Sequence, residues 1–221
     1  MGRFQAETHL AYDSEHYYVP NVNLDDAMDK LKRREKDVGR YHEIMLMTDS
    51  PEKREFQRKY DAFYRVRRNE MWRSEYFRLM RYYMNRTEPS FGEILLRLHQ
   101  STGQIEASFA SKMLATINAN MPIWDKNVLS ALNHCLTGKT PELKMSNAVV
   151  LYDKICRWYQ SFLQTDQAEK MLRRFDLEFP SYRDITTTKK IDFVLWASEQ
   201  NNKKAASVNS IEEGGEQNGF V

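Results

Sequence analysis

A single acid stands in an unusual setting near the middle of the chain. In the stretch MPIWDKNV, Asp125 follows Pro122, Ile123 and Trp124 and precedes a segment of helical pattern. Pro122 disfavours helix at the residue before it, and the apolar side chains can anchor the loop in a core. At a helix start, amide N–H groups and the helix dipole would stabilise the ionised carboxylate. Two interpretations are open: Asp125 is a helix cap, or it is a carboxylate placed in a pocket for chemistry.

The elements that would position this acid are predicted to be helices. Glycine is scarce, the prolines stand singly, and few β-branched runs lie between them. This pattern predicts an all-α fold, a compact multi-helix bundle. Asn23 is expected to cap a helix reaching about Met47, and Ser50-Pro51 to open one long helix reaching about Asn85. A capping box begins at Ser90. Further helices are expected near 106–117, 125–136, 143–163, 167–175 and 188–197.

The same patterns divide the chain into three parts. We expect an N-terminal arm over 1–22, a single all-α domain over 23–197, and a polar, disordered tail over 198–221. No apolar run approaches 20 residues, so no membrane span is predicted, and the N-terminus lacks the apolar core of a signal peptide. The two cysteines form no CxxC pair and are too few for an iron–sulfur cluster. We therefore expect a cytoplasmic protein with reduced thiols.

Charge is unevenly distributed along the chain. The net charge is only +2, but residues 53–86 hold eleven Lys or Arg and four Asp or Glu, interleaved with aromatic residues. Phosphate binding with base stacking is one interpretation, and the solvated face of a helix is the other. Arg65, Arg67 and Arg68 are the candidates for DNA contact, and Lys189 and Lys190, just before IDFVLW, are weaker ones. The histidines lack metal-ligand spacing, so no metal and no cofactor are expected. No Walker, dinucleotide-binding, HExxH or nucleophile-elbow motif occurs.

The order of segments around Asp125 resembles the helix-hairpin-helix DNA glycosylase superfamily. The hairpin-like segment 98–132 contains a loop with Gly103, a helix of small residues (EASFASKML), a turn, and then PIWDKNVLSAL. The last part is similar to the Pro-Ile-x-Asp-x-Asn-Val-x-x-x-Leu segment of adenine DNA glycosylases. All six specified positions are met, by Pro122, Ile123, Asp125, Asn127, Val128 and Leu132.

The resemblance implies roles for particular residues. Asp125 would be the catalytic acid, and Trp124 would line the base pocket, with a core anchor as the alternative. Gly103 would let the hairpin backbone approach a DNA phosphate. The hairpin keeps only that one of the family's glycines, however, and its Glu106 would repel a phosphate. Ser108 stands where bifunctional members carry a nucleophilic lysine, and Lys112 follows one helical turn later. The resemblance therefore implies a monofunctional glycosylase without lyase activity.

Three functions follow from these observations. The first is a monomeric glycosylase that flips a damaged or modified base out of DNA and hydrolyses its N-glycosidic bond, with modified foreign (phage) DNA, and hence antiviral defence, as one setting. The second is a non-catalytic helical DNA-binding protein that kept the fold and lost the chemistry. The third is a helical protein-interaction module in which Asp125 is only a cap.

Overall fold

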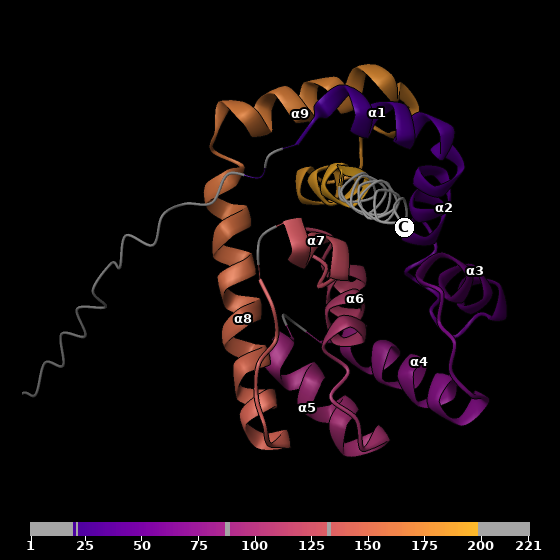
Figure 1. Cartoon of the computed structure of the whole chain (residues 1–221). Helices are drawn as coiled ribbons and strands as arrows, with labels where there is room; N and C mark the ends of the chain where they lie inside the picture. Colours follow the sequence, from indigo (N-terminus) through magenta and orange to yellow (C-terminus); the bar gives the residue numbers. More distant parts are fainter. Residues whose placement is uncertain (1–19, 21, 87–88, 132–133, 199–221) are drawn as a thin grey trace, which may run out of the picture.

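The computed structural model describes residues 20, 22–86, 89–131 and 134–198, and within them the chain is helical with no strand (Figure 1). Ten elements follow in order: α1 (Leu24–Arg33), α2 (Glu35–Met45), α3 (Arg54–Tyr64), α4 (Glu70–Met84), α5 (Phe91–Thr102), α6 (Ala107–Ile117), α7 (Lys126–Ala131), α8 (Pro141–Phe162), α9 (Asp166–Glu178) and the 3-10 turn η1 (Pro180–Tyr182). A last helix covers residues 187–198. The all-α prediction is confirmed. The predicted arm and tail fall almost entirely outside the described residues.

Side-chain caps explain where several of these helices begin. The Asn23 side chain accepts a hydrogen bond from the backbone N–H of Asp26, and Ser90 accepts one from Glu93, as their sequence positions predict. Thr140 caps α8, whose first residue is Pro141. Asp125 immediately precedes α7, and its backbone oxygen accepts from the N–H of Leu129 at 2.9 Å. Asp125 therefore does occupy the N-cap position of a short helix.

The prediction of one long helix over 51–85 is wrong, because the helix is interrupted over residues 65–69. Arg65 ends α3 in the left-handed conformation (φ 53°), and Asn69 caps α4 by accepting from Trp72. The aromatic side chains of the two helices meet, with the rings of Tyr60 and Tyr76 5.9 Å apart. Their hydroxyls share a hydrogen bond of 2.7 Å, and Tyr76 also donates to the backbone oxygen of Phe109. A single straight helix could not bury so many rings, whereas two packed helices can.

A smaller difference occurs in the first predicted helix. The segment 24–45 is divided at Arg34, which has non-helical backbone angles and separates α1 from α2. The Arg34 side chain bonds to Asp37 at 2.7 Å and lies 4.2 Å from the ring centroid of Trp196. This break turns the two helices around the end of helix 187–198, so that their apolar faces can both reach it.

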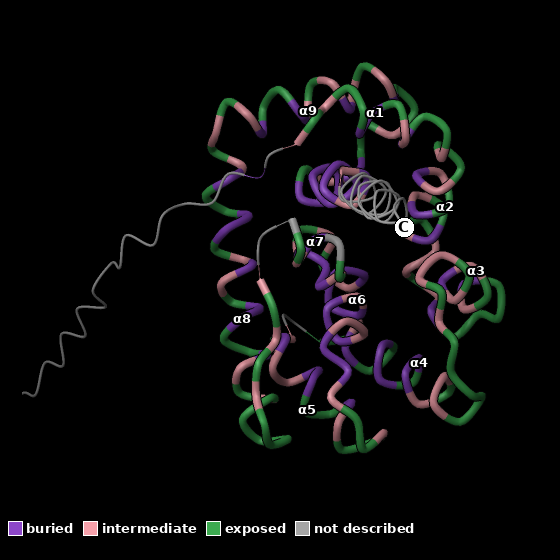
Figure 2. The backbone as a smooth tube through the Cα atoms, in the orientation of Figure 1, coloured by how far each residue is buried: buried purple, intermediate pink, exposed green. Residues whose placement is uncertain are grey.

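The helices form two groups around a buried helix. In one group α5 and α6 pack as a hairpin, with α4 and α8 against them; in the other α2 contacts α1 and α3, and α1 contacts α9. Helix 187–198 (yellow in Figure 1) passes through the middle and is buried along most of its length (Figure 2). Its Phe193 contacts Tyr41 of α2 and Phe175 of α9. The loop that carries Asp125 reaches this helix from the α5–α6 side.

None of the described helices is long and apolar enough to cross a membrane. Both cysteines are free thiols.

Candidate active site

The loop between α6 and α7, residues 118–125, presents Asp125 and is held by hydrogen bonds to two helices. The backbone N–H of Trp124 donates to Oγ of Ser111 in α6 at 2.9 Å. The Tyr152 hydroxyl of α8 donates to the backbone oxygen of Pro122 at 2.8 Å. Because these two bonds come from different helices, the position of Asp125 is set by the packing of α6 and α8 against the loop.

Asp125 lines a cavity of about 370 Å³ between the two helix groups. Its walls come from the start of α2, the end of α3, α6, the Asp125 loop, α7 and helix 187–198. Three aromatic side chains, those of Phe63, Tyr64 and Phe193, form part of the wall. Its size is typical of small-ligand sites, although its lining is more polar than that of most such sites.

The cavity is positively charged. Six cationic side chains line it and only three carboxylates do: Arg34, Arg40, Arg65, Lys112, Lys126 and Lys189 against Asp37, Asp125 and Asp192. Arg34 and Arg40 both pair with Asp37, so their charges are partly compensated. Arg65 and Lys126 are exposed. The charge excess therefore faces solvent at the cavity mouth, where a polyanion could approach.

Lys112 and Lys189 are the inner cations of this cavity. Lys189 is only 7% exposed, and Lys112 is half-buried in α6. Burial lowers the pKa of both amines, and the charge of Asp125 acts in the opposite direction on both. The charge of Lys189 lowers the pKa of Lys112 further. Two cations from different helices thus converge near the candidate acid.

Asp192 joins the Asp125 loop to the buried helix. It is 3% exposed, and its Oδ1 accepts a short hydrogen bond from the Tyr159 hydroxyl of α8. Its Oδ2 has no hydrogen-bond partner among the described residues and lies 3.7 Å from Nζ of Lys189. Burial raises the pKa of Asp192 to about 6, against the lowering effects of Lys189, of the hydrogen bond from Tyr159 and of the Ile123 backbone. Asp192 therefore lies where α8, helix 187–198 and the Asp125 loop meet.

A second hollow lies on the other side of Asp125. It is lined by Ser108, Trp124, Lys126, Leu129 and His134 among others, and Asp125 and Lys126 border both hollows. Ser108, at the position of the family's nucleophilic lysine, therefore faces this second hollow and is not part of the cavity wall formed by Lys112.

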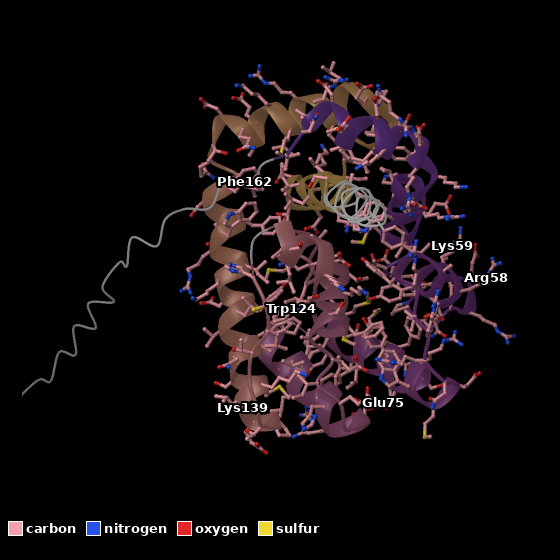
Figure 3. All side chains as sticks on the ribbon, viewed as in Figure 1. Arg58, Lys59, Glu75, Trp124, Lys139 and Phe162 are labelled. Atoms are coloured by element: carbon pink, nitrogen blue, oxygen red, sulfur yellow. The ribbon has the colours of Figure 1, made fainter. Side chains whose placement is uncertain are left out.

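Trp124 belongs to the hydrophobic core. It is 6% exposed and stacks on Phe91, with ring centroids 6.1 Å apart and planes 6° from parallel (Trp124 is labelled near the centre of Figure 3). It borders the second hollow but does not line the charged cavity. This geometry is that of a core anchor. The aromatic wall of the cavity near Asp125 is formed by Phe63, Tyr64 and Phe193.

In the hairpin between α5 and α6, the charge of Glu106 is compensated by a neighbouring arginine. Glu106 is buried and accepts a hydrogen bond of 2.8 Å from Arg68, whose guanidinium also lies over the rings of Trp72 and Phe109. Glu106 is therefore paired and does not project toward solvent as an uncompensated anion. Arg68 is therefore held against the hairpin by this contact. Gly103 ends α5 in the left-handed conformation (φ 71°) and is exposed at the hairpin tip.

The structure brings together some of the predicted residues and separates others. Asp125, Lys112 and Arg65 line one cavity, whereas Gly103 borders a separate hollow with Lys139 and Lys144. Arg67 is exposed in the break after α3. Lys190, a weaker candidate from sequence, points instead to Asp176, at 2.6 Å. Among the described residues no group of three or more His, Cys, Asp or Glu side chains could hold a metal ion.

Sequence reasoning missed several cavity residues. Nothing in the sequence marked Arg34, Arg40 or the rings of Phe63 and Phe193 as neighbours of Asp125. Lys189 was a weaker candidate for DNA contact, since a lysine pair opens an otherwise apolar segment, KKIDFVLW. Its place beside Asp125 could not be predicted without knowing that this helix is buried on nearly all sides.

No protein-family model, curated protein or solved structure matches this chain significantly.

Proposed function

We propose that this chain is a monofunctional DNA glycosylase of helix-hairpin-helix type. One observation carries the proposal: Asp125 lies at the junction of an aromatic, cation-lined cavity and a neighbouring hollow, on a loop held by hydrogen bonds to α6 and α8. A cap alone explains the place of Asp125 at the start of α7. It does not explain a cavity that converges on the side chain.

In the proposed reaction a flipped nucleotide enters the cavity. The rings of Phe63, Tyr64 and Phe193 contact the base, and the Asp125 carboxylate lies near the C1′ carbon of the sugar. The C1′–N bond breaks and the base leaves with the electron pair, so positive charge develops on the sugar. The carboxylate stabilises that charge and accepts a proton from the water that adds to C1′, and that proton then passes to the departing base, which restores the carboxylate. The product is an abasic site.

The charged mouth of the cavity would hold the DNA backbone. Arg65, directly after α3, and Lys126, at the start of α7, are exposed there. Ammonium and guanidinium groups bind phosphates and fix the register of the duplex. Arg67 extends this surface beyond the cavity, whereas Arg68 is held by Glu106 and is left out of the DNA contact.

Ser108 supports hydrolysis without lyase activity, because a hydroxyl cannot form a Schiff base with the sugar. The expected product is thus an intact strand with an abasic site, which breaks only after alkali.

The test is base release from synthetic DNAs. Purified protein is incubated with oligonucleotides carrying damaged or modified bases, and strand breaks are scored before and after alkali. We expect alkali-dependent breaks at one class of base. Strand breaks of equal intensity without alkali would contradict the monofunctional assignment.

The hairpin favours a second candidate, a DNA-binding protein without catalysis. It keeps a single glycine at its tip, so its backbone is less suited to close phosphate contact than the family pattern. Salt-dependent DNA binding with no base released from any substrate would favour this alternative.

A further inference from the structure

Two lysine ammoniums, from helices far apart in the sequence, face the interior of the same cavity. Nζ of Lys112 lies 4.9 Å from the ring centroid of Phe109 and 5.5 Å from that of Tyr64. Nζ of Lys189 lies 4.8 Å from the centroid of Phe193 and 4.9 Å from that of Tyr41. Aromatic faces attract a cation, but they are poor replacements for the hydrogen-bond acceptors that an ammonium has in water.

Acceptors for these two amines are scarce. Within the described part of the chain, Nζ of Lys112 has no hydrogen bond and no ion pair. Lys189 has an ion pair with Asp192, but across 3.7 Å, which is longer than a direct hydrogen bond. The other oxygen of Asp192 is already bound by Tyr159. Each ammonium carries three donors, so most of this donor capacity faces the cavity unmatched.

The charges around the two lysines set the chemistry of what could enter. Asp125 and Asp192 offset part of the charge of the two lysines, but the cavity still holds six cationic side chains against three carboxylates. A ligand group that carries donors, such as an exocyclic amine or an ammonium, would therefore be repelled on balance. A group that carries several acceptors and a negative charge would satisfy the free donors and offset the repulsion between the amines. The cation excess of the whole cavity acts in the same direction.

We infer that the base released by this protein carries an anionic, oxygen-rich substituent, such as a carboxylate, which is received between Lys112 and Lys189. The inference rests on the proposed function and deepens it, because it names the substrate class. The base ring lies against the aromatic wall, and its substituent reaches the two ammoniums while the sugar stays near Asp125.

The test uses one ring and varies only the charge of its substituent. Four duplexes carry, at one position, cytosine with a carboxylate, hydroxymethyl, methyl or aminomethyl group at C5. Binding is measured by fluorescence anisotropy with Asp125→Asn protein, so that base release does not consume the probe. We expect the affinity to fall in that order, with about tenfold or more between the carboxylate and the methyl duplex, as a charge-assisted hydrogen bond gives. Equal affinities, or tighter binding of the aminomethyl duplex, would overturn the inference.

Variants locate the effect within the cavity. Lys112→Met and Lys189→Met keep the length of the side chain without its charge and should each reduce the preference for the carboxylate about tenfold. Lys112→Arg should keep the preference for the carboxylate duplex. It therefore distinguishes the loss of the positive charge from a general disturbance of the structure. Lys126→Met, at the exposed mouth, is the matched control: it should weaken all four duplexes by the same factor. A carboxylate preference that survives both inner Met variants would overturn the inference.

Base release from the same duplexes by the unmodified protein separates the two proposals. Release that does not depend on the substituent charge would contradict the inference and leave the glycosylase proposal standing. Charge-ordered binding that depends on the two lysines, without release of any base, would support the lysine pair and contradict the glycosylase.

Discussion

The backbone N–H of Trp124 donates a hydrogen bond of 2.9 Å to Oγ of Ser111, and these two residues are the immediate neighbours of Asp125 and Lys112 in the chain. One buried hydrogen bond therefore sets the distance between the loop that carries the candidate acid and the helix that carries the inner lysine. Ser111 is fully buried and also donates to the backbone oxygen of Ser108 at 2.9 Å. Small shifts of this contact would move Asp125 relative to the cavity.

Replacing Ser111 with alanine should loosen the loop. The N–H of Trp124 would be left without its acceptor in the core, at a cost of roughly 1–3 kcal/mol in the free energy of unfolding. Base release should fall as well, because Asp125 is no longer held in place. Urea unfolding and single-turnover release measure the two effects. Ser146→Ala, at an exposed position of α8, should change neither; normal release by Ser111→Ala would show that the contact does not position the acid.

The strained conformation of Arg65 provides a test of its role at the cavity mouth. A non-glycine residue at φ 53° costs roughly 1 kcal/mol relative to glycine. Arg65→Gly should therefore keep or slightly raise the stability while weakening DNA binding and lowering the salt dependence by about one counterion. Thermal unfolding and salt titrations of DNA affinity measure these changes. Unchanged DNA affinity would remove Arg65 from the interface.

Arg67 and Arg68 are adjacent in sequence but should respond differently to substitution. Arg67 is exposed, so Arg67→Gln should weaken DNA binding with little effect on stability. Arg68→Gln removes the partner of buried Glu106 and should destabilise the hairpin by about 1–3 kcal/mol. Its direct effect on DNA binding should be small. A larger loss of DNA affinity in Arg68→Gln than in Arg67→Gln, measured where both proteins are folded, would contradict this division of roles.

Asp192 should make the stability depend on pH in an unusual direction. Its pKa is about 6 in the folded protein against 3.8 for an ordinary aspartate, so between these values the folded state binds more protons than the unfolded state. The free energy of unfolding contributed by Asp192 therefore falls as pH rises through that window, by about 3 kcal/mol in total. Comparing the wild-type protein with Asp192→Asn at pH 4 and pH 7 isolates this term. Relative to Asp192→Asn, the wild-type protein should be more stable at pH 4 than at pH 7. The opposite change would contradict a raised pKa for Asp192.

Local signals predicted much of the fold, and long-range packing decided the rest. Asn23 and Ser90 marked helix starts because a cap depends on a few neighbouring residues. The break at Arg65 was not predicted, because a left-handed arginine is unfavourable by itself and is retained here by the packing of Tyr60 on Tyr76. For the same reason the sequence indicated Asp125 but not the cavity around it.

The most direct test of the central claim compares the free base released by the wild-type protein with that released by Asp125→Asn. Wild-type protein, Asp125→Asn and the control Asp153→Asn are incubated with DNA that contains many damaged and modified bases, and the released bases are identified by mass spectrometry. Asp153 is exposed on α8 and pairs with Arg157 at the surface, so its loss should be silent. We predict one class of base released by the wild type and by Asp153→Asn, and at least a 100-fold slower release by Asp125→Asn. Equal release by Asp125→Asn, or no release by any of the three folded proteins, would contradict the assignment of Asp125 as the catalytic residue.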